Sequence, residues 1–179
     1  MSGYYPASFI PNAVALYDFR LAVSAASFDV QNISADYRHL RLVLNGRSDR
    51  AAQVNDGVGI RFNNDSGANY EYQQALSSDV TMTASESFAQ TSFYAGDVPA
   101  ASATANVAGA SIVEILDYAG TTFHKHIIAQ NARAGSATTI TVQQLGGRWA
   151  SATAINRITV ISTTSNNFIA GTRLTIYGY

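Results

Sequence analysis

His124 and His126 are the residues of this sequence whose spacing best suits metal chemistry. They stand two positions apart in a segment with strand-like periodicity, so both side chains leave one face, roughly 7 Å apart along the chain. That distance could serve zinc or nickel, but a site needs a third ligand, and His39 is the only other histidine. The simpler interpretation places both histidines on a solvated surface or a subunit contact. The opposite face then holds the alternate residues Phe123, Lys125 and Ile127.

A loop rich in side-chain oxygens offers a second candidate, a calcium site. The loop contains Asn63, Asn64, Asp65, Ser66, Gly67 and Asn69. Calcium sites usually collect several carboxylates, whereas this loop has a single acid before Glu71. Because the same residue types build ordinary hairpin turns, a plain turn is the preferred interpretation, and we expect neither a metal nor a cofactor.

Catalytic patterns are weak throughout the sequence. There is no G-x-S-x-G motif, no cysteine, and no histidine in a recognisable triad context. A glycosidase could draw a pair from the twelve acids, yet the sequence offers no pair to nominate. We therefore expect a protein that is not an enzyme.

Apart from Lys125, arginine is the only cation among the Lys and Arg positions of the sequence, and between residues 36 and 65 it is interleaved with aspartate. The segment contains Arg38, Arg41, Arg47, Arg50 and Arg61, together with Asp36, Asp49, Asp56 and Asp65. The planar guanidinium makes bidentate contacts with carboxylates and tolerates partial burial, so this segment suits ion pairs within loops or across a subunit boundary. Phosphate binding is the alternative, but the interleaved acids cancel the field that would recruit a nucleic acid.

Five aromatic residues could form a platform for a sugar: Tyr70, Tyr72, Tyr94, Tyr118 and Trp149. Aromatic faces pack on the apolar side of a pyranose, and they also dominate protein contacts. Packing in the core is the commoner use of such residues.

The elements that must position these residues are strands. Apolar residues recur at period two in Leu40, Leu42 and Leu44, and again in Val58, Ile60 and Phe62. Further candidate strands are 14–21, 69–76, 111–118, 122–129, 138–145, 155–161 and 171–177. Eight or more short strands in under 180 residues are best closed as two packed sheets. We predict an all-β fold, an antiparallel sandwich of jelly-roll type with few or no helices.

Glycine-containing pairs and one segment of small residues mark the predicted connections. The pairs are Asn45-Gly46, Asp56-Gly57, Ser66-Gly67, Ala119-Gly120 and Gly146-Gly147. Ala95 to Gly109 is crowded with Ala, Ser and Thr around Pro99, which predicts a long loop with room for a short helix over 100–108.

The first dozen residues differ from the rest of the chain. Pro6 and Pro11 each remove a ladder donor, so we expect an arm over residues 1–12 and one sandwich domain over 13–179. The arm carries Tyr4, Tyr5 and Phe9, whose exposure on a monomer would be a liability, so it should lie on its own sheet or on a neighbouring subunit.

Composition excludes several classes of function. Charged residues make up 13% of the 179 residues and the net charge is −1 at pH 7, which removes the long-range field of a nucleic-acid or membrane-surface binder. No apolar run approaches the roughly 20 residues of a membrane span, and the start lacks the order of a signal peptide. We expect a soluble protein without a nucleic-acid or membrane partner.

Four segments together resemble a group of small structural proteins of tailed bacteriophages. They are YRHLRLVLNGRSDR (37–50), GIRFNNDSGANYEY (59–72), GRWASATAINRIT (147–159) and NFIAGTRLTIYGY (167–179). The first two are similar to that group's opening strand, arginine-bearing loop and Asn-Asp turn. The last two are similar to its closing hairpin and aromatic tail.

The resemblance implies a virion component, a β-sandwich assembled as a homotrimer. The leading expectation is a capsid decoration (cement) protein on the head shell, assembled in the host cytoplasm, with the major capsid protein or other virion proteins as partners. Contact residues would be Tyr4, Tyr5 and Phe9, then Arg47 and Arg50. The alternative is a tail-fibre or receptor-binding module in which Trp149 and surface tyrosines stack on a host glycan.

Overall fold

The computed structural model describes residues 13–136 and 139–179, and all of their regular structure is β-strand. The predicted arm, with Tyr4, Tyr5 and Phe9, lies outside the described residues. No helix within these ranges is long and apolar enough to cross a membrane. The strands of this part of the chain are β1 (Val14–Arg20), β2 (Ser27–Val30), β3 (Leu40–Gly46), β4 (Asn55–Phe62), β5 (Tyr70–Ser78), β6 (Thr81–Gln90), β7 (Phe93–Pro99), β8 (Gly109–Ile115), β9 (Lys125–Ala134), β10 (Ile140–Trp149), β11 (Ile158–Ser162) and β12 (Arg173–Gly178).

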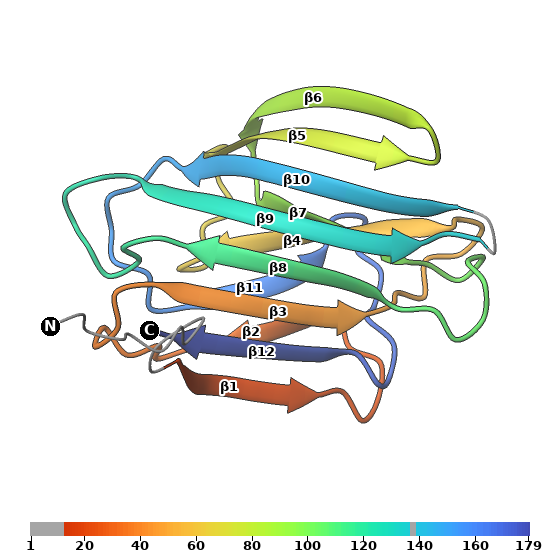
Figure 1. Cartoon of the computed structure of the whole chain (residues 1–179). Coiled ribbons are helices and arrows are strands. Elements are labelled where there is room, and N and C mark those ends of the chain that lie inside the picture. The colour runs from red at the N-terminus through yellow and green to blue at the C-terminus, as the bar shows by residue number, and fades with distance from the viewer. Residues whose placement is uncertain (1–12, 137–138) are drawn as a thin grey trace, which may run out of the picture.

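The strands form two antiparallel sheets that pack as a sandwich (Figure 1). The large sheet has the order β1-β12-β3-β8-β9-β10-β5-β6, and the small sheet has the order β2-β11-β4-β7. The run β1-β12-β3-β8 over β2-β11-β4-β7 is the strand arrangement of a jelly roll, in which strands from both halves of the chain alternate within each layer. The predicted fold class is therefore confirmed.

Two hairpins enlarge only one layer of the jelly roll. β5–β6 follows β4, and β9–β10 follows β8, and both join the large sheet beyond β8. The large sheet consequently extends past the small one, as the upper part of Figure 1 shows. β6 is the free edge there, and most of its residues are exposed.

The period-two patterns form the core between the layers. Leu40, Leu42 and Leu44 of β3 are buried, as are the alternate residues of β4 from Val58 to Phe62. One end of the core is aromatic, because the ring of Phe62 lies 6.1 Å from Tyr70 and 5.6 Å from Trp149.

Three sequence predictions about connections are wrong. Ala95 to Pro99 belongs to β7, an edge strand of the small sheet, where the missing N–H of Pro99 is tolerated and the small Ala95 fits a fully buried position. The loop is confined to 100–108 and contains no helix. Asp56-Gly57 lies within β4 and Gly146-Gly147 within β10, so neither pair is a turn.

Candidate functional site

Arg47 holds the loop between β7 and β8. Its guanidinium donates to the backbone carbonyl oxygens of Thr104 at 2.7 Å, Ala103 at 2.8 Å and Ala101 at 3.2 Å. Those bonds use most of the donors of the guanidinium, so the side chain shapes the 100–108 loop from within the molecule.

Arg50 lies in the β3–β4 connection. Its Nη1 donates to the backbone carbonyl of Asn55, the first residue of β4, at 3.2 Å. The backbone N–H of Ala101 donates to the carbonyl of Arg50 at 3.1 Å. Arg47 and Arg50 therefore both contact the 100–108 loop. Among the described residues, neither guanidinium forms an ion pair with a carboxylate. Their predicted role in partner contact stays a prediction.

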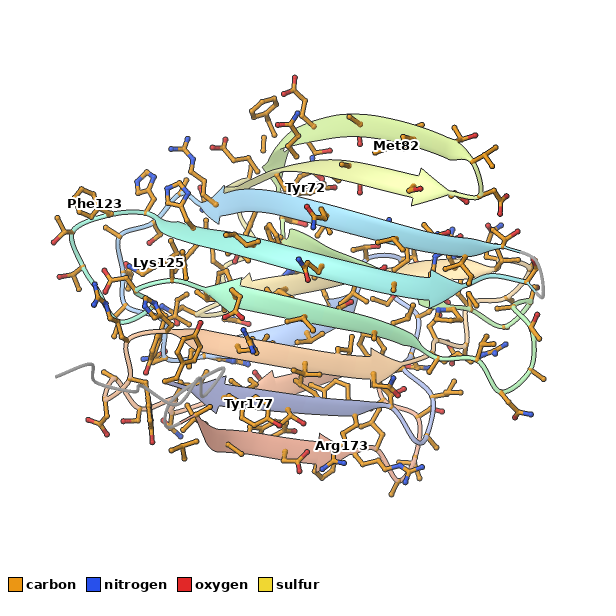
Figure 2. All side chains as sticks on the ribbon, in the orientation of Figure 1. Tyr72, Met82, Phe123, Lys125, Arg173 and Tyr177 are labelled. Carbon is orange, nitrogen blue, oxygen red and sulfur yellow. The ribbon has the colours of Figure 1, made fainter. Side chains whose placement is uncertain are left out.

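The two histidines lie where their spacing places them. His126 is exposed on the outer side of β9, and His124 is exposed just before the strand. On the inner side Lys125 and Ile127 are buried, but Phe123 lies outside the strand and is exposed (Figure 2), because β9 begins only at Lys125. The described residues contain no group of three or more potential metal ligands.

In the loop 63–69, the candidate calcium site, the carboxylate is already engaged in hydrogen bonds within the protein. The carboxylate of Asp65 accepts from the backbone N–H of Gly67 at 2.8 Å, from Asn69 Nδ2 at 2.9 Å and from the indole Nε1 of Trp149 at 2.6 Å. These bonds outweigh the opposing effect of burial and hold the pKa of Asp65 below its usual value. The loop thus fastens Trp149 to the β4–β5 connection.

The aromatic residues divide into core and surface. Tyr70, Tyr118 and Trp149 are buried, which confirms core packing for them and removes Trp149 as a surface platform for a glycan. Tyr72 and Tyr94 are only half-buried, and together they line a surface cavity.

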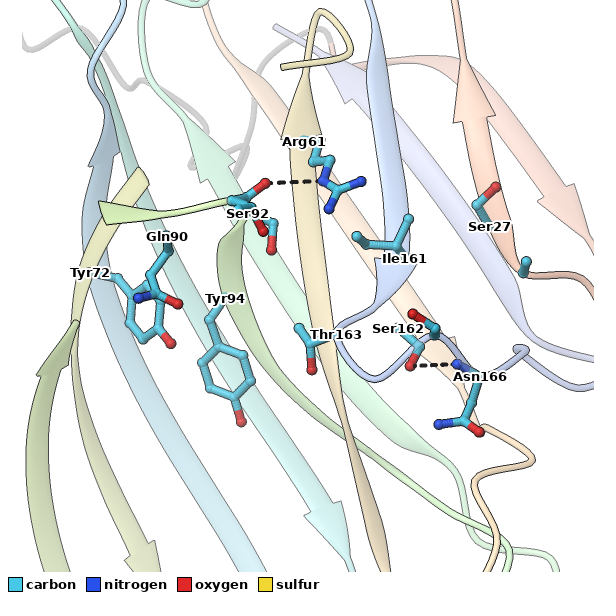
Figure 3. A pocket seen from close by; sticks show the side chains of 13 residues that line it. Ser27, Arg61, Tyr72, Gln90, Ser92, Tyr94, Ile161, Ser162, Thr163 and Asn166 are labelled. Atoms are coloured by element: carbon cyan, nitrogen blue, oxygen red, sulfur yellow. Dashed lines mark hydrogen bonds between the residues drawn. The ribbon is translucent and has the colours of Figure 1, made fainter. Parts of the chain in front are cut away.

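That cavity, which we call the tyrosine pocket, has a volume of about 590 Å³ (Figure 3). It lies over the outer side of the small sheet, beside the β6–β7 connection. Its walls come from the ends of β2, β6 and β11, and from β4, β5 and β7. The lining residues are Ala26, Ser27, Arg61, Tyr72, Gln90, Thr91, Ser92, Tyr94, Ile161, Ser162, Thr163, Ser165 and Asn166.

Behind Tyr94 lies a buried polar cluster between β7 and the β9–β10 hairpin. The carboxylate of Asp97 accepts from Tyr94 Oη at 2.5 Å, Asn55 Nδ2 at 3.0 Å, Arg133 Nε at 3.3 Å and Gln143 Nε2 at 3.4 Å. No local sequence motif signals this cluster, because its members come from four strands.

The outer side of the large sheet is unusually apolar at β8, β9 and β10. The strand register places Ala110 beside Ala132 and Val142, and Ile112 beside Gln130 and Gln144. We call this surface the outer sheet face. Its large apolar members are exposed by 41% at Ile112, 51% at Ile128, 66% at Ile140 and 48% at Val142.

The alternation of β10 is reversed over its first four residues. Ile140 and Val142 point to the outside, while Thr141 and Gln143 point inward and are almost completely buried. A strand on the surface of a lone sandwich normally has the opposite pattern. At Ile140 and Val142 the outer sheet face therefore has the side chains of a buried strand.

The chain matches no family model, no curated protein and no solved structure.

Proposed function

We propose that this chain is a non-enzymatic structural protein of a tailed-phage virion, a capsid decoration protein that assembles as a homotrimer. The single observation that carries the assembly is the reversed alternation of β10, which exposes Ile140 and Val142 and buries Thr141 and Gln143. The four segments that resemble phage structural proteins support the virion context.

The outer sheet face has the size of an interaction surface. It extends over β8, β9, β10 and the adjacent side of β5, which strand spacing and rise convert to roughly 20 Å by 20 Å, or about 400 Å². Within this area Ile112, Ile128, Ile140 and Val142 are exposed among polar side chains such as Gln130 and Gln144. Exposed apolar groups that gather in this way commonly mark contact sites. The neighbouring charged side chains, Glu114 of β8 and the Arg148–Glu71 pair, lie toward one end of the face.

A closed trimer joins two different patches at each contact. The second patch is the projecting β5–β6 hairpin, where Val80 is fully exposed and Met82 is 77% exposed (Figure 2). Each hairpin packs on the outer sheet face of the next copy, which also covers the free edge of β6. Each copy then makes two contacts, and affinity on the head comes from multiplicity.

The first experiment measures the mass of the purified protein in solution. Light scattering should give about three times the chain mass of 19.1 kDa. Ile128→Lys places a charge within the outer sheet face, on the strand beside Glu114, and should give monomers. Val23→Lys is the matched control, because Val23 is 73% exposed in the β1–β2 connection, outside both patches, and the variant should remain trimeric.

A wild-type monomer at micromolar concentration, or a trimer that survives Ile128→Lys, would contradict this mode of assembly. The virion role is tested separately by cosedimentation of the wild-type protein with phage heads that lack decoration protein. Attachment supports the role, and a trimer that stays unbound overturns it. Removal of residues 1–11 should weaken attachment without dissociating the trimer if the arm makes the contact.

A further inference from the structure

We propose that the tyrosine pocket binds an acidic sugar residue, a pyranose that carries a carboxylate. Its volume of about 590 Å³ lies within the range of pockets that hold small molecules. The site does not involve Trp149, and it is independent of the outer sheet face. The inference therefore goes beyond assembly into a virion.

Two tyrosine rings form the apolar wall of the pocket. The ring centroids of Tyr72 and Tyr94 lie 5.5 Å apart, and the ring planes meet at 31°. Figure 3 shows both rings at the same end of the pocket. An aromatic wall of this kind can pack on the apolar face of a sugar ring.

The hydrogen bonds of Tyr94 fix this wall in place. Its hydroxyl donates to Asp97 at 2.5 Å, and Gln143 Nε2 lies 3.4 Å from the hydroxyl oxygen. Burial and the Asp97 carboxylate raise the pKa of Tyr94, so the hydroxyl stays protonated. Tyr94 therefore contributes its ring, and not its hydroxyl, to ligand contact. The hydroxyl of Tyr72 has no hydrogen-bond partner among the described residues and remains open to a ligand.

Arg61 supplies the positive charge of the pocket. Its Nε donates to the carbonyl of Thr91 at 3.0 Å, which sets the direction of the guanidinium (Figure 3). The two terminal nitrogens of Arg61 have no partner among the described residues, and no acidic side chain lines the pocket. A planar guanidinium with both terminal nitrogens open matches a carboxylate.

Hydroxyl groups line the remaining wall. Within the described part of the chain, the side chains of Ser27, Ser92 and Thr163 form no hydrogen bond. Thr163 and Tyr94 close over Gly57, where a Cβ atom would come within 2.4 Å of Thr163 Oγ1. Because positions 57 and 59 of β4 are glycine, Arg61 is the only β4 residue that lines the pocket.

The lining defines the ligand by three properties: one negative charge, several hydroxyl groups and an apolar face. A nucleotide or a phosphate cluster would call for more cations, and Arg61 is the only cationic residue among those that line this pocket. A neutral sugar would leave the guanidinium without its partner. An acidic sugar, such as a uronic or sialic acid, satisfies all three properties.

Calorimetric titration with methyl glucuronide and methyl glucoside tests the proposal. The wild-type protein should bind the glucuronide saturably and about tenfold or more tightly than the glucoside. Arg61→Gln should remove this preference, and Tyr72→Ala should weaken both sugars. Arg38→Gln is the matched control, because Arg38 is exposed, has no acidic partner among the described residues and lies outside the pocket. It should leave both affinities unchanged.

Three results would overturn the proposal: no saturable binding of either sugar or of sialic acid, a preference that survives Arg61→Gln, or acetate binding as tightly as the glucuronide. Light scattering on the same samples separates this outcome from the proposed function. A trimer that binds no sugar overturns only the pocket, and a monomer that binds the glucuronide overturns only the assembly.

Discussion

The indole Nε1 of Trp149, at the end of β10, donates a hydrogen bond of 2.6 Å to the carboxylate of Asp65 in the β4–β5 connection. The two residues are 84 positions apart in the sequence. The bond joins the aromatic end of the core to the β4–β5 connection, which Asn63 also ties to the segment before β11 through hydrogen bonds with Ala154 and Asn156. Asp65 therefore links the packing of Trp149 to the geometry of the loop.

Removal of this bond should destabilise the fold without unfolding it. Trp149→Phe retains an aromatic ring but loses the N–H, and we expect a loss of about 1.5 kcal/mol in the free energy of unfolding, as for a hydrogen bond to a charged acceptor. Urea unfolding of Asp65→Asn, Trp149→Phe and the double variant forms a cycle that isolates the coupling. Strictly additive effects would show that the bond contributes nothing.

Removing one partner of the buried Arg133–Asp97 pair should cost much more stability than removing one partner of an exposed pair. The side chains of Arg133 and Asp97 are 10% and 6% exposed, whereas those of Arg173 and Asp18 are 57% and 40% exposed. Arg133→Met leaves a buried carboxylate without its cation, and we expect a loss of about 3 kcal/mol. Arg173→Met should cost less than about 1 kcal/mol. Equal losses in urea unfolding would contradict the assigned role of burial.

The adjacent glycines of β10 should respond differently to alanine. A Cβ atom at Gly147 would lie 2.2 Å from the carbonyl oxygen of Glu71 and 2.8 Å from the Cα of Tyr72, and both are backbone atoms that cannot turn away. Gly147→Ala should therefore cost about 2 kcal/mol or more. At Gly146 no heavy atom lies within 4 Å, so Gly146→Ala should be neutral or slightly stabilising. Thermal unfolding of the two variants measures the difference.

Buried tyrosines should make the fold sensitive to alkali. Burial raises the pKa of Tyr94 and Tyr70, and burial with the Glu114 hydrogen bond raises the pKa of Tyr179 to about 12. The unfolded chain ionises these groups from a pKa of 10.0, so their stabilising contribution is full below that value and is lost as pH rises toward the folded values. Burial lowers the pKa of Lys125, so this group destabilises the fold at low pH. Its penalty disappears as pH rises to the unfolded pKa of 10.5, which partly offsets the effect of the tyrosines.

Midpoints of thermal unfolding should therefore fall steeply above about pH 10. Tyr94→Phe should reduce the slope, because phenylalanine has no ionisable group in either state. A midpoint that stays constant to about pH 11, or an unchanged slope in Tyr94→Phe, would contradict the assignment.

The sequence predicted the fold where side-chain alternation and burial agree. Leu40, Leu42 and Leu44 have one buried face, and that simple rule located β3 and most of the other strands. It failed for Ala95 to Pro99, whose small side chains give no hydrophobic period although they occupy a buried edge strand. It also missed β6, which is exposed on both sides.

The candidate sites were harder to predict than the fold. In β10 the apolar Ile140 and Val142 point outward, so alternation alone would place the wrong side in the core. The tyrosine pocket unites Arg61 and Tyr72 with residues of β11, and nothing within one segment signals that meeting. Both features depend on which strands become neighbours, and that is fixed only by the complete topology.

The position of β12 between β1 and β3 constrains how the molecule folds. Within the described strands, β1 pairs only with β12, so its ladder can form only after a segment about 150 residues away along the sequence has docked. The two added hairpins need no such distant partner for their first contacts. We therefore expect β5–β6 and β9–β10 to form early, and the β1 margin to be the slowest part of the protein to acquire protection from hydrogen exchange.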